Sequence, residues 1–84
     1  MDTKLLGDPG RRVVGAKQTV KALNKDQVQT VFVAEDADLR VTGPIIAKCK
    51  EKGVELVKVP TMSELGAACS IQVGAAVAAI LKDS

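Results

Sequence analysis

The stretch Gly15-Ala16-Lys17-Gln18-Thr19-Val20-Lys21 decides the fold, because a short apolar strand, Val13-Val14, turns there through a glycine into a helix. A helix N-terminus carries unpaired backbone N–H groups and the positive end of the helix dipole. It therefore favours a phosphate or another ligand rich in hydrogen-bond acceptors. We expect the function of the chain to lie at this junction.

The predicted helix divides into two faces, since a residue returns to the same face about every 3.6 positions. The apolar face consists of Ala16, Val20 and Leu23. The other face is a polar stripe with two cations and consists of Lys17, Lys21 and Asn24. Gln18 lies further round on the open side and adds an amide that can both donate and accept hydrogen bonds. The stripe fits an anionic ligand, although most surface helices carry a solvated lysine stripe of this kind.

The composition is that of one small globular domain spanning residues 1–84. Hydrophobic residues make up 46% of the chain and charged residues 26%, so disorder is not expected. Phe32 is the only aromatic residue, and the core must therefore consist of Val, Ile, Leu and Ala side chains. Such a core suits close packing of helices on a sheet.

The basic residues gather around the predicted helix. Residues 1–25 contain six basic and two acidic side chains, a net charge of +4. Residues 26–84 contain six basic and eight acidic side chains, a net charge of −2. The overall charge of +2 is too small to establish a nucleic-acid partner, but its uneven placement favours one.

Cys49 and Cys69 are twenty positions apart, and the chain has no His and no Cys-x-x-Cys spacing. A zinc site or a redox pair is therefore not expected, and we expect no other cofactor. Buried, reduced thiols are the expected state, which fits a cytoplasmic protein. The N-terminal residues lack the apolar run of a signal peptide, and the longest apolar stretch, Gly74–Leu81, is too short to span a bilayer.

Gly, Pro and capping residues divide the rest of the chain into alternating helices and strands. The predicted elements are a brief helical turn at Thr3–Leu6, a strand at Thr30–Ala34, a helix that starts at Thr42-Gly43-Pro44 and ends at Gly53, a strand at Glu55–Val59, a short helix capped by Thr61 and Glu64, and a strand at Ala75–Leu81. The first and last of these strands are continuously apolar, which is typical of strands buried on both faces. The pattern predicts an α/β fold, a three-layer α/β/α sandwich around a mixed four-stranded sheet.

Two further motifs point to other chemistry. The stretch Gly10–Lys17 comes within one residue of a phosphate-binding P-loop, but Ala16 stands where that motif needs a lysine. Three carboxylates follow a predicted strand and could hold a divalent metal or act as acid and base: Glu35, Asp36 and Asp38. Acidic residues at such a position more often form turns and cap the next helix.

The loop Ser70–Val73 follows the short capped helix, and the expected sheet order places it beside the N-terminus of the lysine-bearing helix. Ile71 and Val73 would then form an apolar lip opposite the cations, although either residue alone is an ordinary core contact. Lysine and glutamine side chains can reach the acceptor edge of a guanine, and an apolar lip can pack on an extruded base. Because the chain lacks the aromatic residues of stacking platforms, this surface favours folded RNA recognised by shape.

Three ordered blocks have compatible spacing: Gly15-Ala16-Lys17-Gln18-Thr19-Val20-Lys21, Val33-Ala34-Glu35-Asp36-Ala37-Asp38 and Glu64-Leu65-Gly66-Ala67-Ala68-Cys69-Ser70-Ile71-Gln72-Val73. In these blocks, and over nearly its whole length, the chain resembles the kink-turn RNA-binding ribosomal proteins of the L-seven-Ae type, in particular their small bacterial branch. The resemblance implies an α/β/α fold that binds kink-turns, in which a bulge and tandem sheared G·A pairs bend an RNA duplex sharply.

The resemblance also implies which residues touch the RNA. Gly15, Lys17, Gln18 and Lys21 would contact the G·A pairs and nearby backbone, Asp38 would lie near the extruded bulge nucleotide, and Ile71, Gln72 and Val73 would pack against the kink. The chain departs from the usual family pattern at three places: Lys17-Gln18 replaces the Asn-Glu of archaeal and eukaryotic members, Leu39 replaces a proline, and Ser70 replaces a glycine. These departures concern base contacts and loop geometry more than the fold.

The sequence therefore predicts a non-catalytic, monomeric RNA-binding protein with a ribosomal or regulatory RNA as its partner and no membrane partner. It would stabilise the bent form of a kink-turn by binding that form alone. Two alternatives stay open. One is a protein-interaction module that docks through Ile71–Val73, and the other, which lacks a His or a nucleophile motif, is a metal-dependent enzyme that uses Glu35, Asp36 and Asp38.

Overall fold

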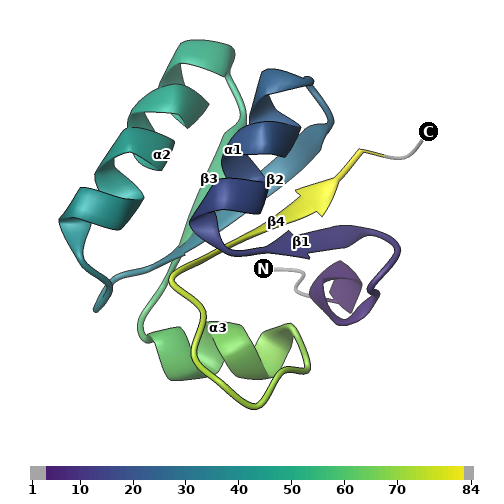
Figure 1. Cartoon of the computed structure of the whole chain (residues 1–84), viewed down its shortest axis with the longest axis vertical. Coiled ribbons are helices and arrows are strands. Elements are labelled where there is room, and N and C mark those ends of the chain that lie inside the picture. The colour runs from purple at the N-terminus through teal and green to yellow at the C-terminus, as the bar shows by residue number, and fades with distance from the viewer. Residues whose placement is uncertain (1–3, 83–84) are drawn as a thin grey trace.

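The computed structural model describes residues 4–82. Its elements in chain order are a 3₁₀ turn Lys4–Gly7, β1 Arg12–Val14, α1 Ala16–Asn24, β2 Val28–Ala34, α2 Leu39–Lys52, β3 Glu55–Val59, α3 Met62–Ala68 and β4 Val77–Leu81. Figure 1 shows α1 and α2 side by side, with α3 apart from both. The predicted three-layer α/β/α fold is confirmed.

The four strands form one mixed sheet, as predicted, and their order is β1-β4-β2-β3. β2 and β3 pair in parallel, whereas β4 is antiparallel to both of its neighbours, β1 and β2. β1, β2 and β3 therefore run in the same direction. Their carboxyl ends and the amino end of β4 lie at the same end of the sheet, which brings together the segments that follow β1 and β2 and the segment that precedes β4.

Alternate residues of the two central strands face opposite layers, as expected for strands buried on both sides. One core cluster joins the sheet to α1 and α2, and the central strands contribute Val31, Val33, Val77 and Ala79 to it. The other joins the sheet to α3 and the 3₁₀ turn, with Phe32, Ala34, Ala78 and Ile80 from the same strands. The small side chains of β4 let helices pack closely on both faces.

Helix α2 begins three residues before the predicted start at Thr42. Asp38 is its N-cap, and the Asp38 carboxylate accepts the backbone N–H of Arg40 at 2.9 Å. Pro44 consequently lies inside the helix rather than at its first turn. The prediction was wrong because an aspartate cap outweighed the proline, which costs the helix only the bond that the Arg40 carbonyl would have accepted.

Several predicted boundaries shift by one or two residues. β2 begins at Val28 instead of Thr30, β4 begins at Val77 instead of Ala75, and the first helical turn ends at Gly7, with Thr3 outside the described residues. Helix α2 ends as predicted at Gly53, which has a left-handed φ of 68°. No helix within residues 4–82 combines the length and the apolar character needed to cross a bilayer.

The buried face of α1 is wider than the predicted apolar stripe. Thr19 and Leu23 are fully buried, whereas Ala16 and Val20 are only partly buried against the same core. Helix α1 packs on the sheet and also against α2, so side chains on more than one flank are covered. Lys17, Lys21 and Asn24 are exposed, as predicted.

Candidate nucleic-acid interface

Gly15 sets the start of α1. Its φ of 100° and ψ of 151° lie where side chains are strained, so glycine is needed for its backbone freedom. The Gly15 N–H donates to the Val77 carbonyl at 2.8 Å, and the Gly15 carbonyl accepts the N–H of Thr19 at 3.1 Å. No side chain caps α1, so the N–H groups of its first turn are left for a ligand or water.

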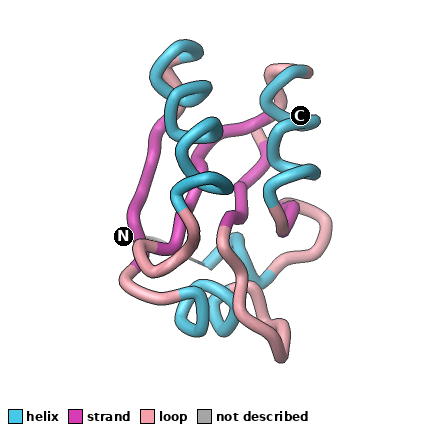
Figure 2. Tube along the Cα trace, turned by 60° about the vertical axis from the view of Figure 1, so that its left-hand side comes forward, coloured by secondary structure: helices cyan, strands magenta, loops and turns pink. Residues whose placement is uncertain are grey.

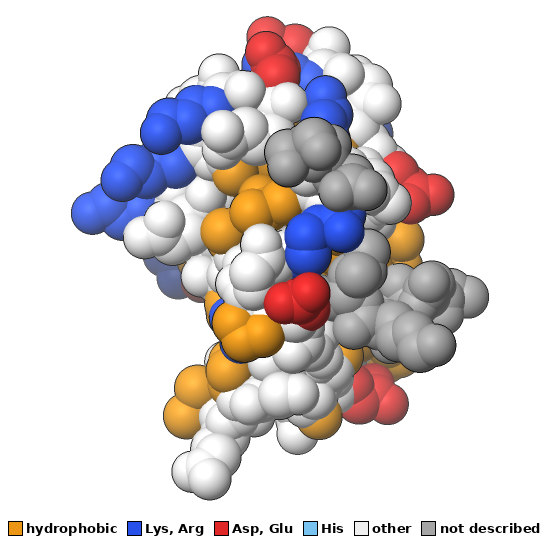
Figure 3. Space-filling view, turned by 90° about the vertical axis from the view of Figure 1, so that its right-hand side faces the viewer, with side chains coloured by type: hydrophobic (Ala, Val, Ile, Leu, Met, Phe, Trp, Pro, Cys, Tyr) orange, Lys and Arg blue, Asp and Glu red, His pale blue; other side chains and the backbone are white. Residues whose placement is uncertain are grey.

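The cations of α1 are free of carboxylate partners within residues 4–82, where the ion pairs are Arg40–Asp38 and Lys52–Asp26. Lys17, Gln18 and Lys21 are all exposed. Gln18 and Lys21 also line a pocket of about 150 Å³ between α1 and the sheet. Figure 3 shows basic side chains along the margin where α1 lies, above a hollow whose lower side is apolar.

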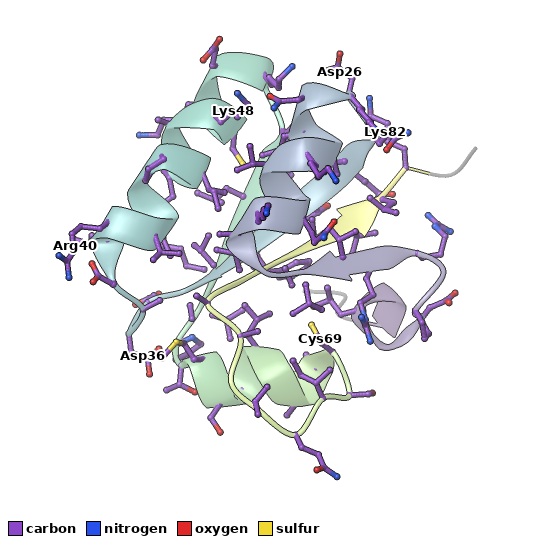
Figure 4. The ribbon with its side chains drawn as sticks, viewed as in Figure 1. Asp26, Asp36, Arg40, Lys48, Cys69 and Lys82 are labelled. Atoms are coloured by element: carbon purple, nitrogen blue, oxygen red, sulfur yellow. The ribbon has the colours of Figure 1, made fainter. Side chains whose placement is uncertain are left out.

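The turn between β2 and α2 uses its carboxylates as helix caps. Asp36 accepts the backbone N–H of Met62 at 2.8 Å and so ties this turn to the start of α3, as its position in Figure 4 shows. Asp38 caps α2 and binds the guanidinium of Arg40, with a shortest distance of 2.7 Å. These hydrogen bonds hold the pKa of Asp38 below its usual value and raise the pKa of Arg40. The expected capping of the next helix is confirmed for Asp38, whereas Asp36 binds the start of α3 instead.

The metal-dependent alternative would need several ligating side chains at one place. Within residues 4–82, no three His, Cys, Asp or Glu side chains come together as a metal site would require. Asp36 and Asp38 instead point to separate partners, Met62 and Arg40.

The loop between α3 and β4 starts from a Schellman motif. The N–H of Ile71 donates to the Gly66 carbonyl at 3.1 Å, and the N–H of Ser70 donates to the Ala67 carbonyl at 3.0 Å. Ser70 occupies the left-handed position of this motif with a φ of 60°, where a glycine would be unstrained. Thr61 caps the other end of α3 by accepting the N–H of Glu64 at 3.0 Å, as predicted.

The loop lies close against α3. A Cβ added to Gly66 would overlap the carbonyl oxygen of Val73, so only glycine permits this approach. Ile71 is half-buried against the α3 core, whereas Gln72 is exposed and Val73 is 71% exposed. Figure 2 shows the loop projecting from the body of the molecule at the end where α3 lies.

Ser70–Val73 was predicted beside the start of α1, but the segment that hydrogen bonds hold there is Ala76-Val77. Ala76 accepts the N–H of Ala34 at 2.9 Å, and Val77 accepts that of Gly15, so the last residues of the loop lie against the start of α1 and the end of β2. The tip, Ile71–Val73, extends along α3 instead. We call the assembled region the candidate surface; it comprises residues 15–21, 35–40 and 70–76.

Apolar side chains that the sequence analysis did not single out flank the candidate surface. Leu39 is 74% exposed, and Val41 and Met62 are exposed as well. Leu39 also lines a pocket of about 270 Å³ between α2 and the carboxyl ends of β2 and β3. Leu39 and Val41 flank Arg40 directly after an acidic turn and outside any strand. This pattern was the signal in the sequence that could have pointed to exposed apolar side chains here.

The sequence and the fold of this chain both match those of known proteins. Residues 2–84 match the model of the ribosomal protein L7Ae/L30e/S12e/Gadd45 family. An RNA-binding protein of Caldanaerobacter subterraneus subsp. tengcongensis is 51% identical over 71 residues, which cover 84% of this chain and 87% of the relative. The RNA-binding protein YbxF of Geobacillus stearothermophilus is 48% identical over 73 residues, 87% of this chain and 89% of the relative.

A solved structure shares the fold. The Giardia lamblia 15.5kD RNA binding protein superposes with a TM-score of 0.88 at 29% sequence identity, over 98% of this chain and 69% of the other. The family model covers nearly the whole sequence, and the bacterial relatives match most of it. The chain described here therefore belongs to the ribosomal protein L7Ae/L30e/S12e/Gadd45 family.

Proposed function

We propose that this protein binds RNA and stabilises kink-turns through the candidate surface. The observation that carries the proposal is the start of α1: uncapped N–H groups behind Gly15, with the exposed side chains of Lys17, Gln18 and Lys21 around them. Such a helix start suits phosphate and guanine acceptors. The names of the bacterial relatives and of the Giardia protein, all called RNA-binding, support the same class of ligand.

The roles proposed for the site residues follow their chemistry. Gly15, Lys17, Gln18 and Lys21 contact the sheared G·A pairs and the adjoining backbone, with Lys21 as a phosphate contact. Ile71, Gln72 and Val73 pack on the kink, where the exposed Val73 offers an apolar contact to a base. Asp38 lies beside the extruded nucleotide. The support is that these segments adjoin one another at a single end of the sheet.

The mechanism is a shift of population. A kink-turn exchanges between extended and bent forms, and a protein that binds only the bent form stabilises it by the difference in affinity. The chain needs to supply a rigid surface and no chemical step. The hydrogen bonds from Gly15 to Val77 and from Met62 to Asp36 hold the parts of that surface together.

The test is a titration of a doubly labelled kink-turn RNA at low magnesium, with end-to-end energy transfer as the signal. The control RNA has its G·A pairs replaced by Watson–Crick pairs. We expect bending and tight binding of the kink-turn alone. Equal, salt-sensitive binding of both RNAs would reduce α1 to a general electrostatic patch and overturn the proposal.

A further inference from the structure

Arg40 is the basic residue of the 35–40 segment of the candidate surface. It lies on the first turn of α2 with 90% of its side chain exposed, and it is flanked by the exposed Leu39. Figure 4 shows it on the outer side of the start of α2, directed away from the sheet. Helices α1 and α2 follow β1 and β2, which run in the same direction, so both helices begin at the same end of the sheet.

Two nitrogens of the Arg40 guanidinium are held by Asp38. Nε lies 3.2 Å from Oδ1 and 3.1 Å from Oδ2, and Nη2 lies 2.7 Å from Oδ2. The Asp38 carboxylate also accepts the Arg40 backbone N–H at 2.9 Å, so both of its oxygens are engaged. Among residues 4–82 no acceptor contacts Nη1, which leaves this nitrogen for an external partner.

We propose that Arg40 contacts a phosphate of the bound RNA and that Asp38 is the residue that positions its guanidinium. The inference rests on the proposed RNA binding. Both oxygens of the carboxylate already accept hydrogen bonds from Arg40, and the Arg40 side chain is the more exposed of the two, 90% against 47%. A phosphate near Nη1 meets the cation first, in the charge-assisted geometry that arginine favours.

The exposed side chains of Leu39 and Arg40 together suit the base and the phosphate of a nucleotide. Leu39, 74% exposed beside Arg40, offers an apolar contact to a base, while Arg40 takes the adjoining phosphate. Because Asp38 holds the guanidinium before binding, less side-chain freedom is lost when the phosphate arrives.

The experiment compares Arg40→Ala with Lys50→Ala in kink-turn binding at several salt concentrations. Lys50 is an exposed cation in the last turn of the same helix, about 15 Å along the axis, so both variants lose one positive charge. We expect Arg40→Ala to weaken binding by roughly fivefold and to lower the slope of log K against log salt by about one. Lys50→Ala should change neither, and thermal unfolding shows that each variant is folded.

The positioning role of Asp38 is tested by the variant Asp38→Asn, which keeps a helix cap, and by its combination with Arg40→Ala. If Asp38 positions the guanidinium, Arg40→Ala costs less affinity in the Asp38→Asn background than alone. If Asp38 only repels RNA, Asp38→Asn tightens binding equally in both backgrounds, which would overturn the positioning role.

The outcomes separate this inference from the proposed function. If the wild type binds the kink-turn and both alanine variants match it, the Arg40 contact is overturned and kink-turn binding stands. If the wild type binds kink-turn and control RNA equally and Arg40→Ala still lowers the salt slope, the kink-turn proposal fails while the phosphate contact is supported. No binding of either RNA would overturn both.

Discussion

The backbone N–H of Gly15 donates to the carbonyl of Val77 at 2.8 Å, which joins the start of α1 to the first residue of β4. These residues are far apart in the chain, yet this bond fixes where the first turn of α1 points. The conformation of Gly15 and the position of β4 in the sheet are therefore coupled through this hydrogen bond.

The first prediction concerns Gly15. Replacing it with alanine adds a Cβ that meets nothing within 4 Å, but the φ of 100° is strained for alanine. We expect Gly15→Ala to lower the free energy of unfolding by about 1–3 kcal/mol. The control is Gly43→Ala in the middle of α2, where the added Cβ also meets nothing and helix propensity should raise stability by about 1 kcal/mol. Urea unfolding of both variants measures the difference, and equal effects would contradict the prediction.

The second prediction separates affinity from specificity on α1. Lys21→Ala should weaken binding of kink-turn and straight duplex alike, because it removes a charge that we propose faces phosphate. Gln18→Ala should instead reduce the preference for the kink-turn, because an amide can distinguish the acceptors and donors of G·A pairs. Competition binding with both RNAs measures the ratio. If both variants kept the wild-type affinities for both RNAs, these roles would be wrong.

The third prediction concerns the close approach of the loop to α3. A methyl group at Gly66 would overlap the Val73 carbonyl, so Gly66→Ala must push the loop outward. We expect a loss of stability of about 1–3 kcal/mol from overpacking, together with weaker kink-turn binding in the fraction that is folded. Chemical denaturation and binding at a temperature well below the unfolding midpoint test the two effects separately. Wild-type affinity in the folded variant would show that the position of Ile71–Val73 does not matter.

The fourth prediction follows from the left-handed φ of Ser70. Glycine relieves this strain, so Ser70→Gly should raise stability by about 0.5–1 kcal/mol. Ser63 is exposed within α3, and the same substitution there should lower stability by a similar amount. Thermal unfolding of the two variants gives the comparison. A destabilised Ser70→Gly would mean that its side chain contributes more than the strain costs.

The fifth prediction concerns the two thiols. Cys49 and Cys69 are buried, and this burial raises the pKa of each thiol. At pH 8 a thiol-specific reagent should label the folded protein much more slowly than the urea-unfolded protein. Because the folded protein holds these protons more tightly, the stability they contribute is present below the pH at which unfolded cysteine ionises and is lost as the pH rises further. Rapid labelling of the folded protein would contradict the burial.

Much of the fold could be predicted because burial leaves a direct pattern in the sequence. The apolar runs in β2 and β4 indicated two-sided burial, and Thr61 with Glu64 indicated the start of α3. The start of α2 was misplaced, because Asp38 and Pro44 both resemble helix-start residues and the sequence alone does not show that Asp38 is the cap. The position of Asp38 beside Arg40 was likewise hidden, since two residues of opposite charge predict no particular geometry.

The candidate surface was predictable as a set of segments but not as a shape. The sheet order was expected to bring Ser70–Val73 beside α1, whereas Val77 bonds Gly15 there. Ile71–Val73 follows α3, where Gly66 lets the backbone approach. The buried face of α1 was also underestimated, since Thr19 is fully buried in addition to the apolar stripe. Tertiary contacts of this kind have no local signature.

The place of β4 in the sheet has a consequence for synthesis of the chain. β4 comes last among the described strands, yet it lies between β1 and β2 and supplies the carbonyl that holds Gly15. A nascent chain that ends before Val77 thus carries all of Lys17, Gln18 and Lys21 while its sheet is still open. The complete candidate surface should therefore form only after synthesis has passed Leu81 and β4 has left the ribosome.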